Sequence, residues 1–204
     1  MSWLFDMGPD GEPGKDDARS ILTGCHAGLC ESWFAAWADW KNEASARLRG
    51  RVSNRSRAGC INDLAVEASK ELLAGVAEVE FDADLGFHKL YVADKIVLRF
   101  KRLDKDYLAL VGQSDQQQDF YLGRPIEGLR NHCLRLNVGY VLDPSEDHIS
   151  DVLITRQFGR DKLLWSYSIF DDAEETRVIE PVARVGGPPN IRFGSRDDIA
   201  REGS

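Results

Sequence analysis

Residues 94–106 (DKIVLRFKRLDKD) concentrate five cationic residues in a chain whose formal net charge is -8. Charged and apolar residues alternate along this segment, which is typical of a strand, and successive side chains of a strand point to opposite faces. Lys95, Arg99 and Lys101 therefore share one face. An arginine fork can bind an oxyanion through two N–H groups, so Arg99 and Lys101 form a candidate site for a carboxylate or a phosphate.

The preceding residues 78–84 carry an acidic stripe with the same period, which includes Asp82 and Asp84. One interpretation is a solvated sheet face, on which acids and cations form lateral ion pairs worth about 0.2–1 kcal/mol each. Another is a metal-dependent nuclease, in which Asp82 and Asp84 would hold the metal and Lys101 would position the nucleophile. Such nuclease cores carry an acid two residues before the lysine. Arg99 stands at that position, so the nuclease is only an alternative.

The cysteines and histidines do not show the spacing of a zinc site or of a hydrolase motif. His132 and Cys133 are neighbours, and we expect their side chains to point in opposite directions, as on a strand. A nucleophile–base pair is therefore not expected there. We expect separate reduced thiols, no bound metal and no cofactor. The four cysteines are Cys25, Cys30, Cys60 and Cys133.

Two apolar groups could bind a partner or pack internally. Trp33, Trp37 and Trp40 fall on one stripe of a predicted helix, a pattern typical of a buried face. Near the C-terminus, PPNIRFG places Ile191 and Phe193 in a segment without regular periodicity. Such a segment can add to a sheet edge or a groove of another protein. A disordered or self-docked tail is the alternative.

Hydrophobic periodicity predicts two helices, about residues 30–49 and 61–74, followed by a change to a period of two. A short helix after Ser114 is also expected. The fold class is therefore α+β, with two N-terminal helices packed on a mostly antiparallel sheet of about six strands. The predicted strands are residues 77–82, 87–92, 95–103, 134–143, 149–157 and 162–170.

The 204 residues, 43% hydrophobic and 29% charged, suit one globular domain with tails. We expect a flexible segment at 1–19, a single α+β domain at 20–172 and an extended tail at 173–204. The sequence lacks an apolar run of about 18 residues and the pattern of a secretory signal, which favours a cytoplasmic protein. The acidic balance disfavours non-specific binding to nucleic acid.

Several motifs resemble those of a group of poorly characterised bacterial and prophage proteins, often encoded beside helix-turn-helix regulators fused to ImmA-type metallopeptidases. These motifs are VLRFKRLD, LNVGYVLD and ISDVLIT followed by LLWSYSI. The resemblance covers about residues 61–170. It departs from the group where a proline-rich stretch is replaced by GRPIEG. It implies a bacterial cytoplasm, a role in mobile-element or antiphage-defence regulation, and a protein partner, but no catalytic residues.

Together these observations favour a non-enzymatic protein-binding module of a bacterial regulatory or toxin–antitoxin-like system. Arg99 and Lys101 would anchor an acidic group of a regulator or toxin encoded nearby, with Tyr140 on a neighbouring strand. Ile191 and Phe193 complete the set of candidate binding residues. The alternatives are a metal-dependent nuclease acting on DNA or RNA and a sensor of a small anionic ligand.

Overall fold

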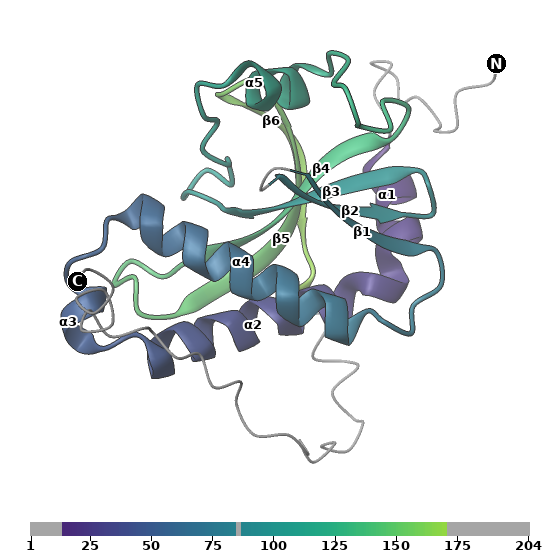
Figure 1. The fold of residues 1–204 in the computed structure, drawn as a ribbon. Coiled ribbons are helices and arrows are strands. Elements are labelled where there is room, and N and C mark those ends of the chain that lie inside the picture. The colour runs from purple at the N-terminus through teal and green to yellow at the C-terminus, as the bar shows by residue number, and fades with distance from the viewer. Residues whose placement is uncertain (1–13, 85–86, 171–204) are drawn as a thin grey trace, which may run out of the picture.

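The computed structural model describes residues 14–84 and 87–170 (Figure 1). Among the described helices, none has the length together with the apolar character that crossing a bilayer requires. The helical elements are α1 (Lys15–Leu22), the 3₁₀ turn η1 (Thr23–Cys25), α2 (His26–Glu43), α3 (Ala46–Arg49), α4 (Asn54–Leu72) and α5 (Asp115–Leu122). The strands are β1 (Val79–Asp84), β2 (Phe87–Val92), β3 (Ile96–Arg102), β4 (Leu134–Leu142), β5 (Ile149–Phe158) and β6 (Lys162–Ser168).

The six strands form one sheet in the order β1-β2-β3-β4-β5-β6. All neighbours are antiparallel except β3 and β4, which are parallel. This architecture confirms the predicted α+β fold with a mostly antiparallel sheet. Parallel neighbours need a long crossover connection, because the chain must return to the same end of the sheet. Residues 103–133, which include α5, form this crossover.

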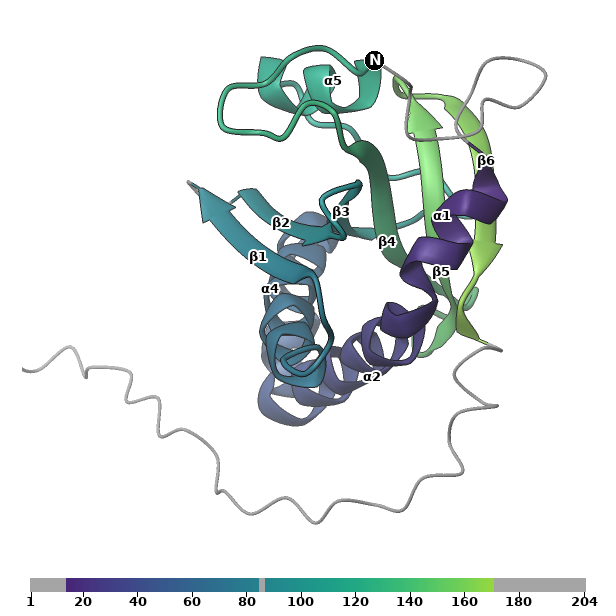
Figure 2. The same ribbon diagram turned by 90° about the vertical axis from the view of Figure 1, so that its right-hand side faces the viewer.

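The N-terminal helices cover one face of the sheet and bury the main core against it (Figures 1 and 2). Trp33 is fully buried, and its ring centre lies 4.8 Å from that of Tyr140 and 5.7 Å from that of Phe100. Trp37 and Trp40 are also buried in this core. The tryptophan stripe is therefore a packing face of α2, as its helical spacing predicts.

The crossover covers the opposite face of the sheet, which the sequence pattern had not revealed. Figure 2 shows α5 on the other side of the sheet from α2 and α4. A second buried cluster fills the space between crossover and sheet. The polar strand face therefore lies partly under protein instead of facing solvent. This cluster contains Phe87, Tyr91, Val97, Leu103, Ala109, Val111, Phe120, Tyr121, Ile126, Leu129, Cys133 and Leu153.

The helix boundaries differ from the sequence prediction. Residues 15–19, expected in the flexible segment, form the start of α1, and α2 begins at His26 instead of Cys30. The chain leaves α2 at Ala44, whose backbone is extended, and α4 begins at Asn54, seven residues before Ile61. Capping explains this early start, because the Ser53 hydroxyl accepts a hydrogen bond from a backbone N–H of the first turn.

Ion pairs hold the β4–β5 turn against the rest of the domain. Glu146 in this turn pairs with Arg57 of α4 and, at 2.5 Å, with Arg102 of β3. These two arginines lower the pKa of the Glu146 carboxyl. The predicted tail at 173–204, including Ile191 and Phe193, lies outside the described residues.

Candidate anion-binding site

The central strand β3 places Arg99 and Lys101 on the face that the crossover covers. In the parallel register with β4, Arg99 is opposite Asn137 and Lys101 is opposite Gly139. The positive charge of Arg99 acts on Lys101 and contributes to lowering its pKa. The two side chains therefore share a face, as the two-residue period predicts, and they are close enough for their charges to interact.

Arg99 is a buried cation whose partners are aromatic rings. It is 6% exposed, and its guanidinium carbon lies 3.9 Å from the ring centre of Phe87 and 5.2 Å from that of Phe120. Within residues 14–84 and 87–170, Arg99 has no hydrogen-bond acceptor or ion-pair partner, and its Nη1 atom is fully buried. Cation–π contacts contribute about 0.5–2 kcal/mol. Burying an ion costs several kcal/mol, so these contacts offset only part of that cost.

Lys101 is a second cation without an acid. It forms no ion pair and donates no hydrogen bond within the part of the chain that the structure describes. Burial, with the charge of Arg99 as the second cause, lowers the pKa of Lys101 to about 7. Its side chain is only partly buried, so solvent reaches the site at this end of the pair.

Neutral polar groups lie near Arg99, since Asn137 is opposite it in the β3–β4 register and Tyr121 acts on its charge. The Tyr121 hydroxyl of α5 donates to Asn137 Oδ1 at 3.0 Å, and Asn137 Nδ2 donates to Thr155 Oγ1 at 3.3 Å. All three residues are buried. Burial raises the pKa of Tyr121 to about 12, so its phenol stays neutral and does not balance the charge of Arg99.

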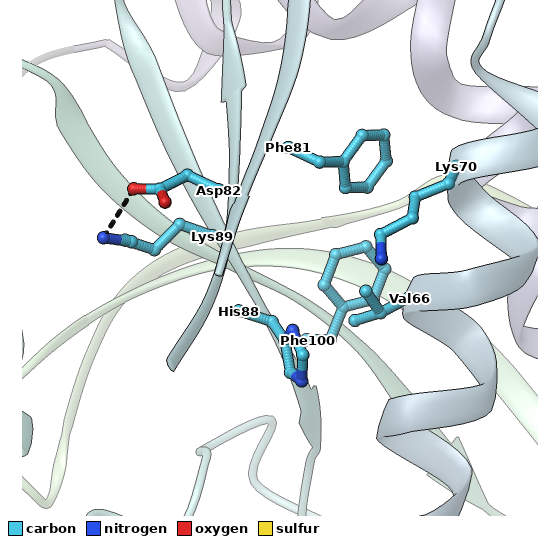
Figure 3. A pocket seen from close by; sticks show the side chains of 7 residues that line it. All are labelled: Val66, Lys70, Phe81, Asp82, His88, Lys89 and Phe100. Carbon is cyan, nitrogen blue, oxygen red and sulfur yellow. Dashed lines mark ion pairs between the residues drawn. The ribbon is translucent and has the colours of Figure 1, made fainter. Parts of the chain in front are cut away.

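The acidic stripe neutralises a different cation. Asp82 on β1 pairs with Lys89 on β2 at 2.7 Å, and Lys89 Nζ also approaches the Gly128 carbonyl at 3.5 Å. Figure 3 shows this ion pair beside a pocket of about 80 Å³ between α4 and the first strands. Asp82 is therefore engaged by a lysine of the neighbouring strand, which weakens the nuclease hypothesis. The pocket is lined by Val66, Lys70, Phe81, Asp82, His88, Lys89 and Phe100.

Tyr140 does not belong to this site. It is opposite Arg102 in the β3–β4 register, so it points to the helical face, where it packs against Trp33. The prediction that Tyr140 accompanies Arg99 and Lys101 is wrong, because the parallel register pairs Gly139 with Lys101. A Cβ atom at Gly139 would lie 2.5 Å from the Lys101 carbonyl oxygen, so only glycine allows this close approach.

Sequence reasoning missed Tyr121, Asn137 and Thr155. Asn137 stands between Leu136 and Val138, and Thr155 follows Leu153 and Ile154; a polar residue within such a short apolar run is the signal that could have found them. The involvement of Tyr121 depends on the packing of α5, for which the sequence gives no such sign.

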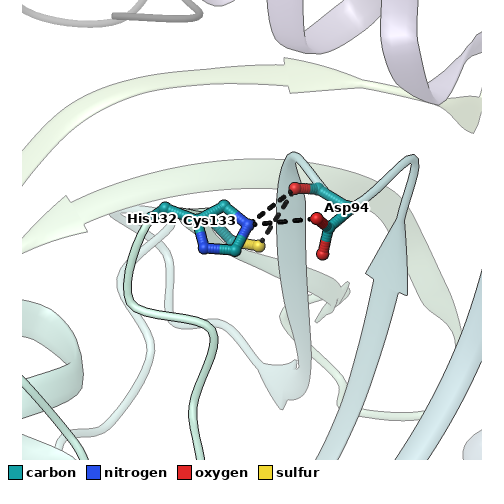
Figure 4. Close-up of side chains that lie close together, drawn as sticks. All are labelled: Asp94, His132 and Cys133. Carbon is teal, nitrogen blue, oxygen red and sulfur yellow. Dashed lines mark hydrogen bonds and ion pairs between the residues drawn. The ribbon is translucent and has the colours of Figure 1, made fainter. Parts of the chain in front are cut away.

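A second polar group forms at the edge of the crossover (Figure 4). Asp94, His132 and Cys133 each offer one ligand atom, and these atoms all lie within 4.8 Å of one another. The prediction that His132 and Cys133 point in opposite directions is wrong. Strand β4 begins only at Leu134, so strand alternation does not apply to the two residues before it.

Comparison with known proteins does not identify this site. No model of a protein family, no curated protein and no solved structure matches the chain.

Proposed function

We propose that this chain is a non-enzymatic binding module for a small ligand that carries a phosphate or carboxylate group. Arg99 and Lys101 would bind the anionic group. The observation that supports the proposal is that these two cations lie together, one buried and one partly buried, and that neither forms an ion pair with an acid among the described residues. An anion would satisfy the Arg99 donors and offset the repulsion between the two charges.

The surroundings favour a compact oxyanion over a cation or an apolar ligand. Two positive charges repel metal ions, and hard cations need oxygen ligands that this cluster offers only as neutral amide and hydroxyl groups. The planar guanidinium matches two oxygens of a phosphate or carboxylate, and the Lys101 ammonium adds a point charge. Phe87 and Phe120 hold the Arg99 plane in place, so little side-chain entropy is lost on binding.

Burial of Arg99 distinguishes a small ligand from a folded partner. At 6% exposure, Arg99 is covered by the crossover, and a protein surface would reach it only after the crossover moves. A small ligand would have to enter from the Lys101 end, where the side chain is partly exposed. Recognition of a regulator or toxin, which the resemblance implies, stays a prediction, and so does nuclease activity.

The test is a calorimetric titration of the full chain with inorganic phosphate and, separately, with acetate. We expect saturable binding of at least one of them. A ligand at about 100 times its Kd should also raise the free energy of unfolding by about 2.7 kcal/mol. Arg99→Met and Lys101→Met should each abolish both effects, because each removes one of the two charges.

The matched control is Lys105→Met, which makes the same charge change at an exposed position after β3. It should bind the anion like the unchanged protein. Equal loss of binding in Lys105→Met and Lys101→Met would show that the titration reports only general surface charge. Absence of saturable binding to either anion would refute the proposed class of ligand.

A further inference from the structure

The cluster of Asp94, His132 and Cys133 is assembled by backbone geometry. Asp94 occupies the tight β2–β3 turn, where Ala93 and Asp94 both adopt positive φ values of 52° and 50°. Such values are typical of the two-residue turns that join antiparallel strands. The parallel pairing then sets the start of β4 beside this turn, since the Leu134 N–H donates to the Lys95 carbonyl at 2.7 Å. His132 and Cys133 therefore arrive next to Asp94.

The three ligand atoms lie close together. His132 Nε2 lies 3.3 Å from Asp94 Oδ2 and 3.1 Å from the Asp94 carbonyl oxygen. Cys133 Sγ lies 3.5 Å from the same carbonyl oxygen. In a tetrahedral zinc site with bonds of about 2.0–2.3 Å, neighbouring ligand atoms are roughly 3.3–3.8 Å apart. The three ligand atoms lie within 4.8 Å of one another, so the side chains would have to rotate to reach that spacing.

The chemistry of the ligands selects the metal. A thiolate, an imidazole and a carboxylate together suit a borderline-soft ion with tetrahedral preference, which describes Zn²⁺. Magnesium and calcium prefer oxygen ligands only and would not use Cys133. His132 and Asp94 are exposed, so an ion can enter from solvent, while the buried Cys133 closes the inner side.

Neighbouring residues orient the carboxylate in the way that outer partners of metal ligands do. Arg130 donates to Asp94 Oδ1 at 3.1 Å, which leaves Oδ2 directed at His132. Glu80 pairs with the same guanidinium at 2.5 Å and offsets its charge, and the Tyr91 ring lies beneath it at 4.4 Å. The positive charge next to Asp94 is therefore already balanced. Without a metal, His132 pairs with Asp94 and the Cys133 thiol donates to the Asp94 carbonyl oxygen; zinc would replace both interactions.

We propose that Asp94, His132 and Cys133 bind one Zn²⁺ ion, with a water molecule as the fourth ligand. Binding would convert the Cys133 thiol to a thiolate and release its proton to solvent. The ion would fasten the C-terminal end of the crossover to the β2–β3 turn. Because the ligands do not include Arg99 or Lys101, the zinc proposal can be tested independently of anion binding.

The test is a titration of the full, chelator-treated chain with Co²⁺, followed by its displacement with Zn²⁺. We expect saturation at one equivalent, with visible bands of tetrahedral cobalt and a near-ultraviolet thiolate-to-cobalt band. Cys133→Ser should lose the thiolate band, and His132→Ala should lose both the bands and saturable binding. Zn²⁺ should also raise the melting temperature of the unchanged protein, but not that of His132→Ala.

Cys60→Ser is the matched control, since Cys60 is an exposed thiol on α4. It should keep every cobalt band. If circular dichroism shows that Cys133→Ser is unfolded, His132→Ala decides the question, because the His132 side chain is 53% exposed. The proposal is overturned by non-saturable Co²⁺ binding, by bands that persist in His132→Ala, or by a thiolate band that disappears in Cys60→Ser.

Discussion

Substitution of Lys101 by methionine tests the buried positive charge on which the proposed anion site depends. Burial, followed by the charge of Arg99, lowers the pKa of Lys101 from 10.5 to about 7. Between these two values the unfolded chain holds a proton on Lys101 that the folded chain has released. The free energy of unfolding must therefore rise with pH in this window. Below the window Lys101 is charged in both states, so the folded state bears the full cost of burying the charge.

The size of the effect follows from the width of the window. One proton contributes at most about 1.4 kcal/mol for each pH unit, so between about pH 7 and about pH 9 the expected rise is about 2 kcal/mol. Lys101→Met keeps the length of the apolar stem but cannot be charged. The variant should be more stable than the unchanged protein near pH 7, and the difference should shrink by about 2 kcal/mol towards pH 9.

The assay is urea denaturation at several pH values in this window, monitored by tryptophan fluorescence, since Trp33 is fully buried. Subtracting the two free energies at each pH cancels the titration of all other groups. Among the neighbouring groups, burial lowers the pKa of Arg99 and raises the pKa of Tyr121 to about 12. Lys105→Met should show no pH-dependent difference. A constant difference between Lys101→Met and the unchanged protein would refute the buried-cation argument.

Three further predictions follow from the same structure. Acetate affinity should fall as the pH rises above about 7, because binding must restore the proton on Lys101 while acetate itself stays ionised. Calorimetry in buffers of different ionisation enthalpy should detect this proton uptake. Glu146→Gln should lower the free energy of unfolding by about 0.5–1 kcal/mol at neutral pH. Because the folded-state pKa of Glu146 is depressed, this difference should vanish as the pH falls through that pKa, and a loss that persists in acid would contradict the ion-pair explanation. Gly139→Ala should cost about 1–3 kcal/mol or more through the clash with β3, measured by urea denaturation. Gly59→Ala, in open space on α4, should be neutral or stabilising, and equal destabilisation by both would refute the close-approach argument.

Local periodicity was sufficient to predict the strands and the side of β3 on which the cations lie. Each predicted strand overlaps an observed one, and their ends agree within two residues. Strand alternation depends only on the backbone, so the shared face of Arg99 and Lys101 could be predicted. The start of α4 could also have been inferred, because Ser53 is a capping residue type in front of the helix.

The remaining features depend on contacts between distant segments. The position of Tyr140 follows from the β3–β4 register, and a shift of one residue would have placed it beside Lys101. The meeting of Asp94 with His132 and Cys133 joins residues 38 and 39 positions apart. The packing of α5 over Arg99 also depends on contacts between distant segments, because the sequence of an eight-residue helix does not show which surface the helix covers.

The parallel pairing of β3 and β4 connects the two proposed sites. An antiparallel β4 could follow β3 through a short turn, and the polar face of β3 would then remain open to solvent. A parallel β4 requires the crossover at 103–133, which places Phe120 and Tyr121 over Arg99 and buries this cation, while Lys101 stays partly exposed. The same pairing brings the start of β4 to the β2–β3 turn, where the proposed zinc ligands meet. Since the metal site would hold one end of the segment that encloses the anion site, zinc should slow the opening of the crossover. Hydrogen exchange of the crossover amides should therefore decrease on zinc addition in the unchanged protein but not in His132→Ala.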